Sequence, residues 1–280
     1  MGVKKVFIFG GTHGNEWTGI YAIKKFASLI SSEFKELDIE FILANPEAFK
    51  INKRFKDEDL NRAFQYLNEN RSHSYEHSRA REIQKLIKKQ ECFVIDLHTT
   101  TSNMGSTIII TRNHKSNFTV CSGLSNVKII FSPDVEKKYL VSQSETGVMI
   151  EVGPVANGLI EAVPLYETLR LIREILFNLI VKKPTPSILE VYEEVEDIYY
   201  PQKDGEIDGH IHEQFQGKDF QGLYGEYIPF RNFSGQEIRK ETKEVLYPIF
   251  INEAAYYSSK LAFTLCRKKN FNTNAMPNIN

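Results

Sequence analysis

The first 181 residues alternate between short apolar runs and longer amphipathic stretches. Six apolar runs have the length of strands, and several lack polar–apolar alternation, which is typical of strands covered on both faces. They lie at 6–9, 39–44, 92–97, 106–110, 127–131 and 148–152. Three stretches repeat apolar residues at helical spacing, and they lie at 16–31, 75–89 and 161–181. This alternation predicts an α/β fold with a mostly parallel sheet flanked by helices.

The pattern changes after "VKKPTPS" at 181–187. Helical periodicity fades there, and short β-like segments such as "LEVYEEV" and "VLYPIFI" are separated by Gly, Pro, Asn and Asp. We therefore predict two domains. Residues 1–184 form the α/β domain, and residues 185–280 form a smaller β-rich C-terminal domain.

Composition and charge narrow the class of partner. The chain has 280 residues, 41% of them hydrophobic, which is enough to bury a substantial core. Its 35 basic and 36 acidic residues leave a net charge of -1, so no overall field attracts nucleic acid or an anionic membrane. A small molecule is the expected partner, with no nucleic acid and no membrane. The oligomeric state is left open, a homodimer included.

The sequence also predicts a cytoplasmic location. The apolar runs are too short for a signal peptide or a membrane span. Three scattered cysteines, an odd number, fit a reducing compartment better than a disulfide framework.

Chemically versatile side chains follow three of the predicted strands. His13 and Glu16 come after the first strand, His98 ends "FVIDLH", and Glu151 ends "VMIEV". In an open α/β sheet, ligands bind beyond the carboxyl ends of the strands, so these side chains are expected at one edge. Two histidines and one carboxylate suit a catalytic zinc and leave Glu151 free. Asp96 would point to the same side as His98 and could orient it.

The pair of His13 and Glu16 has a simpler explanation when it is taken alone. A helix is predicted to start at residue 16, and a glutamate at a helix N-terminus complements the helix dipole. The short spacing of the pair is therefore weak evidence for a metal site by itself.

A second metal motif competes with the first. The segment "HSYEH" at 73–77 fits the H-x-x-E-H pattern of inverted zinc peptidases. Its neighbours are polar on every side, which predicts an exposed lead-in to a helix, whereas a catalytic zinc needs a partly dry cavity. His210 and His212 could also reach one ion, but a solvated turn explains them better. We therefore favour the ligands at the strand ends.

Five segments together resemble a known family. They are "GGTHGNE", "DLNRAF", "DLHTTTSNMG", "EVGP" and "YPIFINEAAYY", and they occur in order along essentially the whole chain. They resemble the aspartoacylase branch of the aspartoacylase and succinylglutamate desuccinylase family, which is related to the zinc carboxypeptidases. The resemblance implies a zinc-carboxypeptidase-like catalytic domain. It also implies a hydrolase that deacylates N-acyl amino acids, with N-acetyl-L-aspartate as the first candidate substrate. A desuccinylase or an aminoacylase for another N-acyl amino acid is the alternative.

The resemblance also implies roles for individual residues. One zinc per chain would be held by His13, Glu16 and His98. Glu151 would act as general base and then as general acid, in contact with the substrate. Arg54 resembles the residue that contacts the substrate and polarises the scissile carbonyl group.

Further substrate contacts are implied on both domains. Asn61 and Arg62 resemble the pair that grips the substrate carboxylate, although "NKRFKDEDLNRAF" at 52–64 has the composition of an ordinary solvated loop. Tyr256 and Lys260 resemble contacts that the C-terminal domain contributes.

One departure from the family pattern concerns substrate choice. Counted back from Glu151 without gaps, another substrate-binding arginine of the family falls on Val141, and "KKYLVSQSETG" contains no arginine. This predicts looser side-chain selectivity than in the family, unless Lys137 or Lys138 takes over the role.

Overall fold

The computed structural model describes residues 4–67, 74–181 and 187–273. The six predicted strands and three predicted helices are confirmed. The strands are β1 (Lys5–Gly10), β2 (Asp38–Leu43), β3 (Cys92–Thr99), β4 (Gly105–Ile110), β5 (Lys128–Phe131) and β6 (Gly147–Gly153). The helices are α1 (Trp17–Glu33), α4 (Tyr75–Lys88) and α6 (Ala162–Val181).

Short elements fill the connections between them. The helical ones are α2 (Pro46–Lys50), α3 (Leu60–Ala63), η1 (Phe64–Tyr66), α5 (Lys115–Thr119), η2 (Val141–Gln143) and η3 (Ala254–Tyr256). Two short strands, β8 (Gln202–Lys203) and β9 (Glu206–Ile207), pair with each other. In the described ranges, no helix combines the length and apolarity that crossing a membrane requires.

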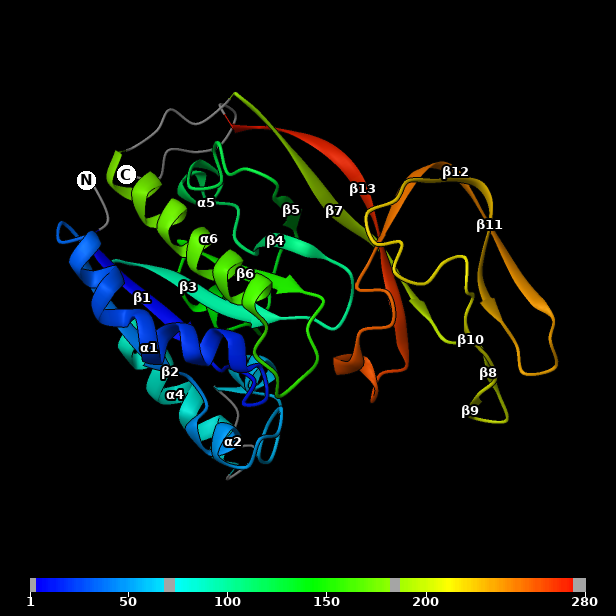
Figure 1. Ribbon diagram of the computed structural model, residues 1–280, viewed down its shortest axis with the longest axis horizontal. Coiled ribbons are helices and arrows are strands. Elements are labelled where there is room, and N and C mark those ends of the chain that lie inside the picture. Colours follow the sequence, from blue (N-terminus) through cyan, green and yellow to red (C-terminus); the bar gives the residue numbers. More distant parts are fainter. Residues whose placement is uncertain (1–3, 68–73, 182–186, 274–280) are drawn as a thin grey trace.

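The α/β body is a three-layer arrangement (Figure 1). Strands β2, β1, β3 and β6 are parallel neighbours, and β4 runs antiparallel to β6 but parallel to β5. Alternate residues of β1 face opposite layers: Ile8 packs with α1 and α6, whereas Phe9 packs with α4. The sheet is therefore covered on both faces, as its apolar strands predicted.

The C-terminal part continues the same sheet. Strand β7 (Ile188–Tyr199) pairs parallel with β5 and antiparallel with β13 (Leu261–Asn272). Beyond β13 follow β12 (Glu237–Ile249), β11 (Leu223–Arg231) and β10 (His210–Ile211), which completes an eleven-stranded sheet. The expected short β segments at 189–195 and 245–251 thus belong to longer strands. The predicted domain boundary between residues 184 and 185 lies outside the described residues.

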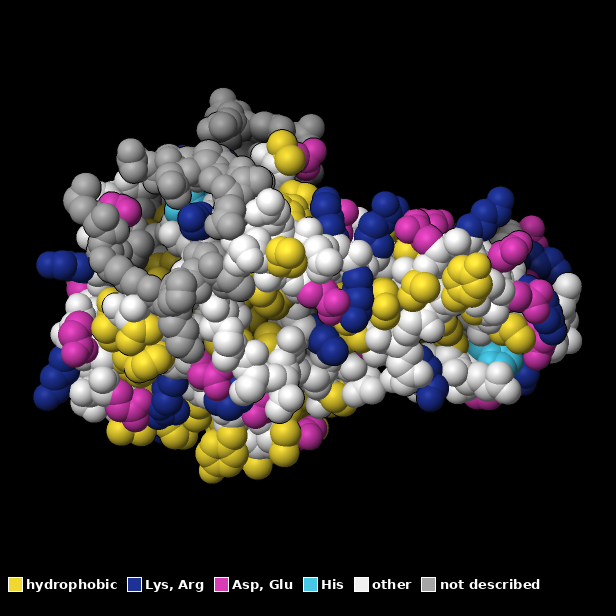
Figure 2. Space-filling view, turned by 90° about the horizontal axis from the view of Figure 1, so that it is seen from above, with side chains coloured by type: hydrophobic (Ala, Val, Ile, Leu, Met, Phe, Trp, Pro, Cys, Tyr) yellow, Lys and Arg dark blue, Asp and Glu magenta, His cyan; other side chains and the backbone are white. Residues whose placement is uncertain are grey.

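The long strands carry a second core away from the α/β body. Phe230, Phe263 and Leu265 are buried there, in a cluster separate from the two layers of the body. This part forms the narrow extension seen in Figures 1 and 2. On the face shown in Figure 2, acidic and basic side chains are interspersed over both parts. That pattern agrees with the balanced composition.

Candidate metal centre and substrate cavity

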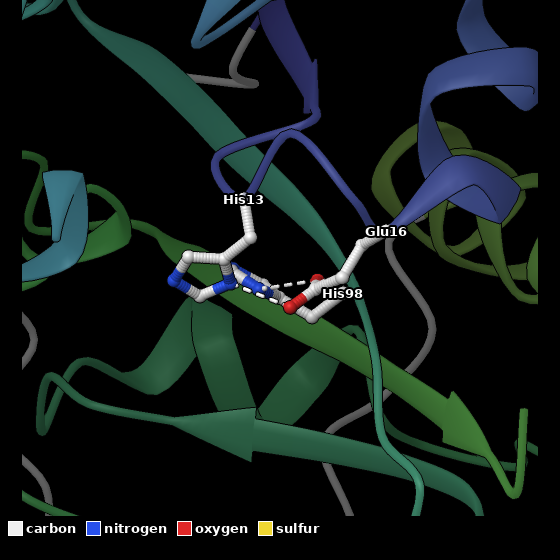
Figure 3. A group of neighbouring side chains, drawn as sticks. All are labelled: His13, Glu16 and His98. Carbon is white, nitrogen blue, oxygen red and sulfur yellow. Dashed lines mark hydrogen bonds and ion pairs between the residues drawn. The ribbon is translucent and has the colours of Figure 1, made fainter. Parts of the chain in front are cut away.

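Two histidines and one glutamate converge at the carboxyl edge of the sheet (Figure 3). Nδ1 of His13 lies 2.6 Å from Oε1 of Glu16, and Nδ1 of His98 lies 3.2 Å from Oε2 of the same carboxylate. All three side chains are buried, and their potential ligand atoms lie within 4.8 Å of one another. Among the residues that the structure describes, no other group of three such side chains meets that spacing.

The local backbone explains why one short loop delivers two of these side chains. Gly11 adopts a φ of +74°, which glycine accepts without strain. At Gly14, an added Cβ would lie 2.1 Å from the carbonyl carbon of Ala48, so only glycine allows the loop to pack on α2. Glu16 occupies the N-cap position of α1 but its side chain makes no capping hydrogen bond. Its carboxylate faces the histidines instead, so helix capping does not account for it.

Two further carboxylates hold the outer nitrogens of the histidines. Nε2 of His98 lies 2.8 Å from Asp96, as the alternation along the strand predicted, and Asp96 also accepts a 2.7 Å hydrogen bond from the Thr12 hydroxyl. Nε2 of His13 lies 3.2 Å from Asp59. Carboxylates in this position fix the ring orientation of metal-binding histidines and leave the other nitrogen for the metal. The sequence pattern alone indicates no role for Asp59.

The charges of the carboxylates fit a cation site. Burial alone would raise the pKa of Glu16, but His13 and His98 outweigh this effect and hold the pKa well below its usual range. The pKa of Asp59 is likewise low, because His13 and Arg54 outweigh the effect of its burial. Both groups therefore stay ionised. Two imidazoles and an ionised carboxylate in a buried pocket form a donor set that suits zinc.

Glu151 lies beside this group without belonging to it. It is the register partner of His98 across the β3–β6 pair, and it is buried. Its carboxyl group makes no hydrogen bond to any described residue. Burial raises its pKa well above the usual value, and the nearby carboxylates of Glu16 and Glu253 add to this effect. Glu151 is thus positioned to exchange a proton with a molecule in the pocket.

The predicted substrate residues have different locations. One open cavity, with a volume of about 100 Å³, is lined by the three potential ligands, Glu151, Arg54, Asn61, Arg62 and Tyr256. Lys260 does not line it. The Lys260 ammonium group donates a 2.6 Å hydrogen bond to the carbonyl oxygen of Gly205. The structure therefore brings all the predicted site residues together except Lys260.

The two arginines are held in different ways. Arg54 donates a 3.0 Å hydrogen bond to Asp59 and lies 3.5 Å from Glu16. Arg62 is exposed, and its guanidinium carbon lies 5.1 Å from the centre of the Tyr139 ring. No carboxylate of a described residue lies within 4.0 Å of the guanidinium group of Arg62. Its positive charge is therefore available to an anion in the cavity.

Asn61 is more constrained than the sequence suggested. Its side-chain oxygen accepts a 3.0 Å hydrogen bond from the backbone N–H of Leu140, and its amide nitrogen lies 3.5 Å from Nε2 of His98. Asn61 is therefore tied to the loop before η2 as well as facing the cavity.

A glutamate from the C-terminal part ties the two halves of the cavity together. Glu253 is buried and accepts hydrogen bonds from the hydroxyl of Thr100, the backbone N–H of Thr101 at 2.8 Å and the backbone N–H of Ser102 at 3.3 Å. Thr100 lies two residues after His98, and Tyr256 is the last residue of η3, the short turn that Glu253 caps. Glu253 lies within the "YPIFINEAAYY" segment, but the sequence alone indicates no role for it.

The competing "HSYEH" motif has a structural role in the described part of the chain. Glu76 and His77 are buried, so the prediction of an exposed segment is wrong for these two residues. Glu76 accepts hydrogen bonds from the backbone N–H groups of Lys56 at 2.7 Å and Asp57 at 3.0 Å. Its carboxylate is thus committed to the loop that carries Arg54 and Arg62. His73 lies outside the described residues.

We expect Glu76→Gln to weaken the positioning of that loop. An amide cannot accept hydrogen bonds at both of its ends, so at least one buried backbone N–H would lose its partner, at a cost of about 1–3 kcal/mol. The free energy of unfolding should fall by that amount, and the catalytic efficiency expected of the cavity should fall with it. Denaturant titration and kinetics measure both. Glu82→Gln, at an exposed position of the same helix, is the matched control. Unchanged stability and kinetics in Glu76→Gln would contradict the role.

The other histidine pair is also used structurally. The ring of His212 accepts a 3.2 Å hydrogen bond from the backbone N–H of Gln214 and lies 3.0 Å from the guanidinium group of Arg231. His210 is exposed at the end of the sheet. These contacts leave no shared metal position for the two histidines.

Val141 does not face the substrate cavity. It lies in η2, is 1% exposed and packs in the core layer beside α4. An arginine at this position would be buried in an apolar layer, so the expectation that it could reach the substrate is not supported. Lys137 pairs with Glu145 at 3.1 Å and lies outside the cavity lining. From this segment, Tyr139 is the residue that lines the cavity.

Known proteins resemble both parts of this chain. Residues 2–178 match the succinylglutamate desuccinylase/aspartoacylase catalytic domain, and residues 187–268 match the AstE/AspA barrel-sandwich hybrid domain. A probable aspartoacylase of Trichodesmium erythraeum is 40% identical, over 95% of this chain and 98% of that protein. The human N-acyl-aromatic-L-amino acid amidohydrolase (carboxylate-forming) is 33% identical, over 98% and 94%. The crystal structure of murine aminoacylase 3 superposes with a TM-score of 0.87 at 29% identity, and 97% of each chain is covered.

Proposed function

Since the chain belongs to the succinylglutamate desuccinylase/aspartoacylase family of N-acyl amino acid hydrolases, we propose that it is a zinc-dependent enzyme that deacylates a small N-acyl-L-amino acid. The observation that carries the proposal is one cavity in which His13, Glu16 and His98 converge next to the carboxyl group of Glu151, which has no hydrogen-bond partner in the described part of the chain. A protein that merely stored a metal ion would not need this additional buried acid.

The proposed chemistry assigns a separate task to each group. When bound, zinc would lower the pKa of a water molecule to about 7 and polarise the substrate carbonyl group. Glu151 would take the proton of the attacking water and then deliver it to the leaving amine nitrogen. Arg54 would donate hydrogen bonds to the oxygen that becomes negative, a contribution typically of about 3 kcal/mol per donor. Arg62 would bind the α-carboxylate through its planar pair of N–H groups.

Two substrate classes remain to be separated. N-acetyl-L-aspartate, cleaved to acetate and L-aspartate, follows from the resemblance to aspartoacylases and is the first candidate. An N-acyl amino acid with another side chain is the second, and a specific observation favours it: the cavity carries an acidic residue, Glu194, together with the apolar side chains of Ile109 and Met149. A desuccinylase would differ in the acyl group. Turnover of N-acetyl and N-succinyl forms of the same amino acid separates these enzymes.

Substrates with a free α-carboxylate should be cleaved in preference to the corresponding α-amides. The carboxylate can form charge-assisted hydrogen bonds with Arg62, and an amide loses about 1.5–3 kcal/mol of that interaction. We expect kcat/KM of the zinc-loaded enzyme to be roughly 10- to 100-fold higher for the acid. Arg62→Gln should remove most of this ratio. Arg173→Gln, on α6 and paired with Glu33, is the control. Equal rates for acid and amide in the wild type would refute the role of Arg62.

A further inference from the structure

The floor of the cavity runs across four neighbouring strands. In β6, Met149 and Glu151 are two residues apart and share a face. Met149 pairs with Ile109 of β4, and β4 is followed by β5 and β7 in the sheet. Ser132 directly follows β5, Glu194 lies in β7, and all five residues line the same cavity. The floor therefore begins at the proposed proton-transfer group, becomes apolar, and ends at a hydroxyl and a second carboxylate.

The carboxylate at the far end is only partly satisfied. Oε2 of Glu194 accepts a 2.7 Å hydrogen bond from the Ser132 hydroxyl, whereas Oε1 accepts none from the described part of the chain. In the same part of the chain, no Lys, Arg or His nitrogen lies within 4.0 Å of this carboxylate. Glu193, its neighbour on the opposite face of β7, is paired with Lys269 at 2.7 Å. The contrast within one strand indicates that Glu194 is available to a ligand.

Glu194 is accessible and yet surrounded by protein, because it faces the hollow of the cavity. Burial raises its pKa, and the hydrogen bond from Ser132 opposes this effect. Tyr256 lines the same cavity, and burial followed by the nearby charge of Glu194 raises its pKa. A hydrogen-bond donor or a cation placed there would satisfy Glu194, and an anion would be repelled.

The spacing fits a long side chain better than that of aspartate. Three strand intervals separate β6 from β7, which is about 14 Å between the backbones. The aromatic ring of tyrosine or the methylene chain of lysine could cover Met149 and Ile109 and carry its polar end toward Glu194. The carboxylate of aspartate would instead lie over the apolar floor without a partner and in the field of Glu194.

We infer that Glu194, supported by Ser132, forms the end of a side-chain subsite for N-acyl amino acids that have an apolar stem and a terminal hydrogen-bond donor or ammonium group. The subsite disfavours acidic side chains, so the inference selects the second of the two substrate classes and not N-acetyl-L-aspartate. This inference rests on the proposed function, because it describes the selectivity of the same cavity.

Three matched pairs of substrates test the subsite on the zinc-loaded enzyme. N-acetyl-tyrosine against N-acetyl-phenylalanine isolates a hydroxyl, N-acetyl-lysine against N-acetyl-norleucine isolates an ammonium group, and N-acetyl-asparagine against N-acetyl-aspartate isolates a negative charge. We expect kcat/KM to favour the first member of each pair by about tenfold or more. The size of the tyrosine and lysine preferences tells whether a neutral or a charged donor fits better.

The variant Glu194→Gln keeps the size of the side chain and removes its charge. It should reduce the lysine preference and the discrimination against aspartate to within about threefold of unity. The control Glu193→Gln makes the same chemical change on the other face of β7, and its substrate ratios should equal those of the wild type. Unchanged ratios in Glu194→Gln, with active enzyme, overturn the subsite and leave the proposed deacylation intact.

Binding measurements keep the two proposals distinguishable. Calorimetric titration of the same pairs into zinc-loaded Glu151→Gln enzyme reports the subsite without turnover. Tighter binding of the lysine and asparagine derivatives than of their matched partners supports the subsite. Failure of the wild type to cleave any of the six compounds would count against deacylation but not against the subsite. Equal affinities within these pairs refute the subsite.

Discussion

Glu151→Gln should lower kcat by about two to four orders of magnitude, while the protein keeps its fold and its zinc. This range is typical for the loss of one general acid–base group, and Glu151 is assigned both the base and the acid step. Glutamine has nearly the same shape, so the buried position next to His98 can accommodate it. Steady-state kinetics, metal analysis and circular dichroism on one preparation measure the three properties together.

The same experiment can contradict the assignment. A variant that is zinc-loaded, folded and nearly as active as the wild type would show that another group transfers the proton. Glu40→Gln, at an exposed position of β2 outside the cavity, is the control for a glutamate change that should leave kcat unchanged.

His98→Ala should remove most of the bound zinc and, with it, the activity. His98 supplies one of three expected ligands, and its Nδ1 is the atom directed at Glu16. Loss of a residue that only orients a metal ligand typically costs 10- to 100-fold in metal affinity, and loss of the ligand itself should cost more. Metal content after dialysis against a weak chelator, compared with about one zinc per wild-type chain, measures the effect.

His77→Ala is the informative comparison for this prediction. His77 belongs to the competing motif and is buried, and no described residue forms a hydrogen bond with its Nε2. If the ligands at the strand ends hold the metal, this variant keeps its zinc. Full zinc in His98→Ala together with loss of zinc in His77→Ala or His73→Ala would show that "HSYEH" is the metal motif.

The sequence by itself determined the secondary structure of the α/β body and the edge at which its chemistry gathers. Strands such as 92–97 and helices such as 161–181 are encoded by local hydrophobic periodicity, which needs no knowledge of distant residues. Parallel strands end at a common edge, so placing His13 and His98 at strand ends was enough to predict that they meet.

Tertiary structure decided which of the polar loop residues take part. Asp59 and Glu76 look like solvated charges in the sequence. In the structure, Asp59 contacts the ring of His13, and Glu76 accepts hydrogen bonds from the loop that carries Arg54. Val141 and Lys260 matched positions of substrate residues. Val141 lies in the core, however, and Lys260 lies outside the cavity lining. The reach of a loop side chain depends on its backbone conformation and on partners far away in the sequence.

The cavity floor shows the same limit on a larger scale. Glu194 lies in a strand that the sequence assigned to a separate β-rich domain, and only the pairing of β7 with β5 brings it next to Ser132. A strand pattern specifies which side chains share a face but not which strand will be its neighbour. Periodicity therefore determined the elements and the metal edge, whereas the long-range pairing of strands decided which side chains surround the substrate.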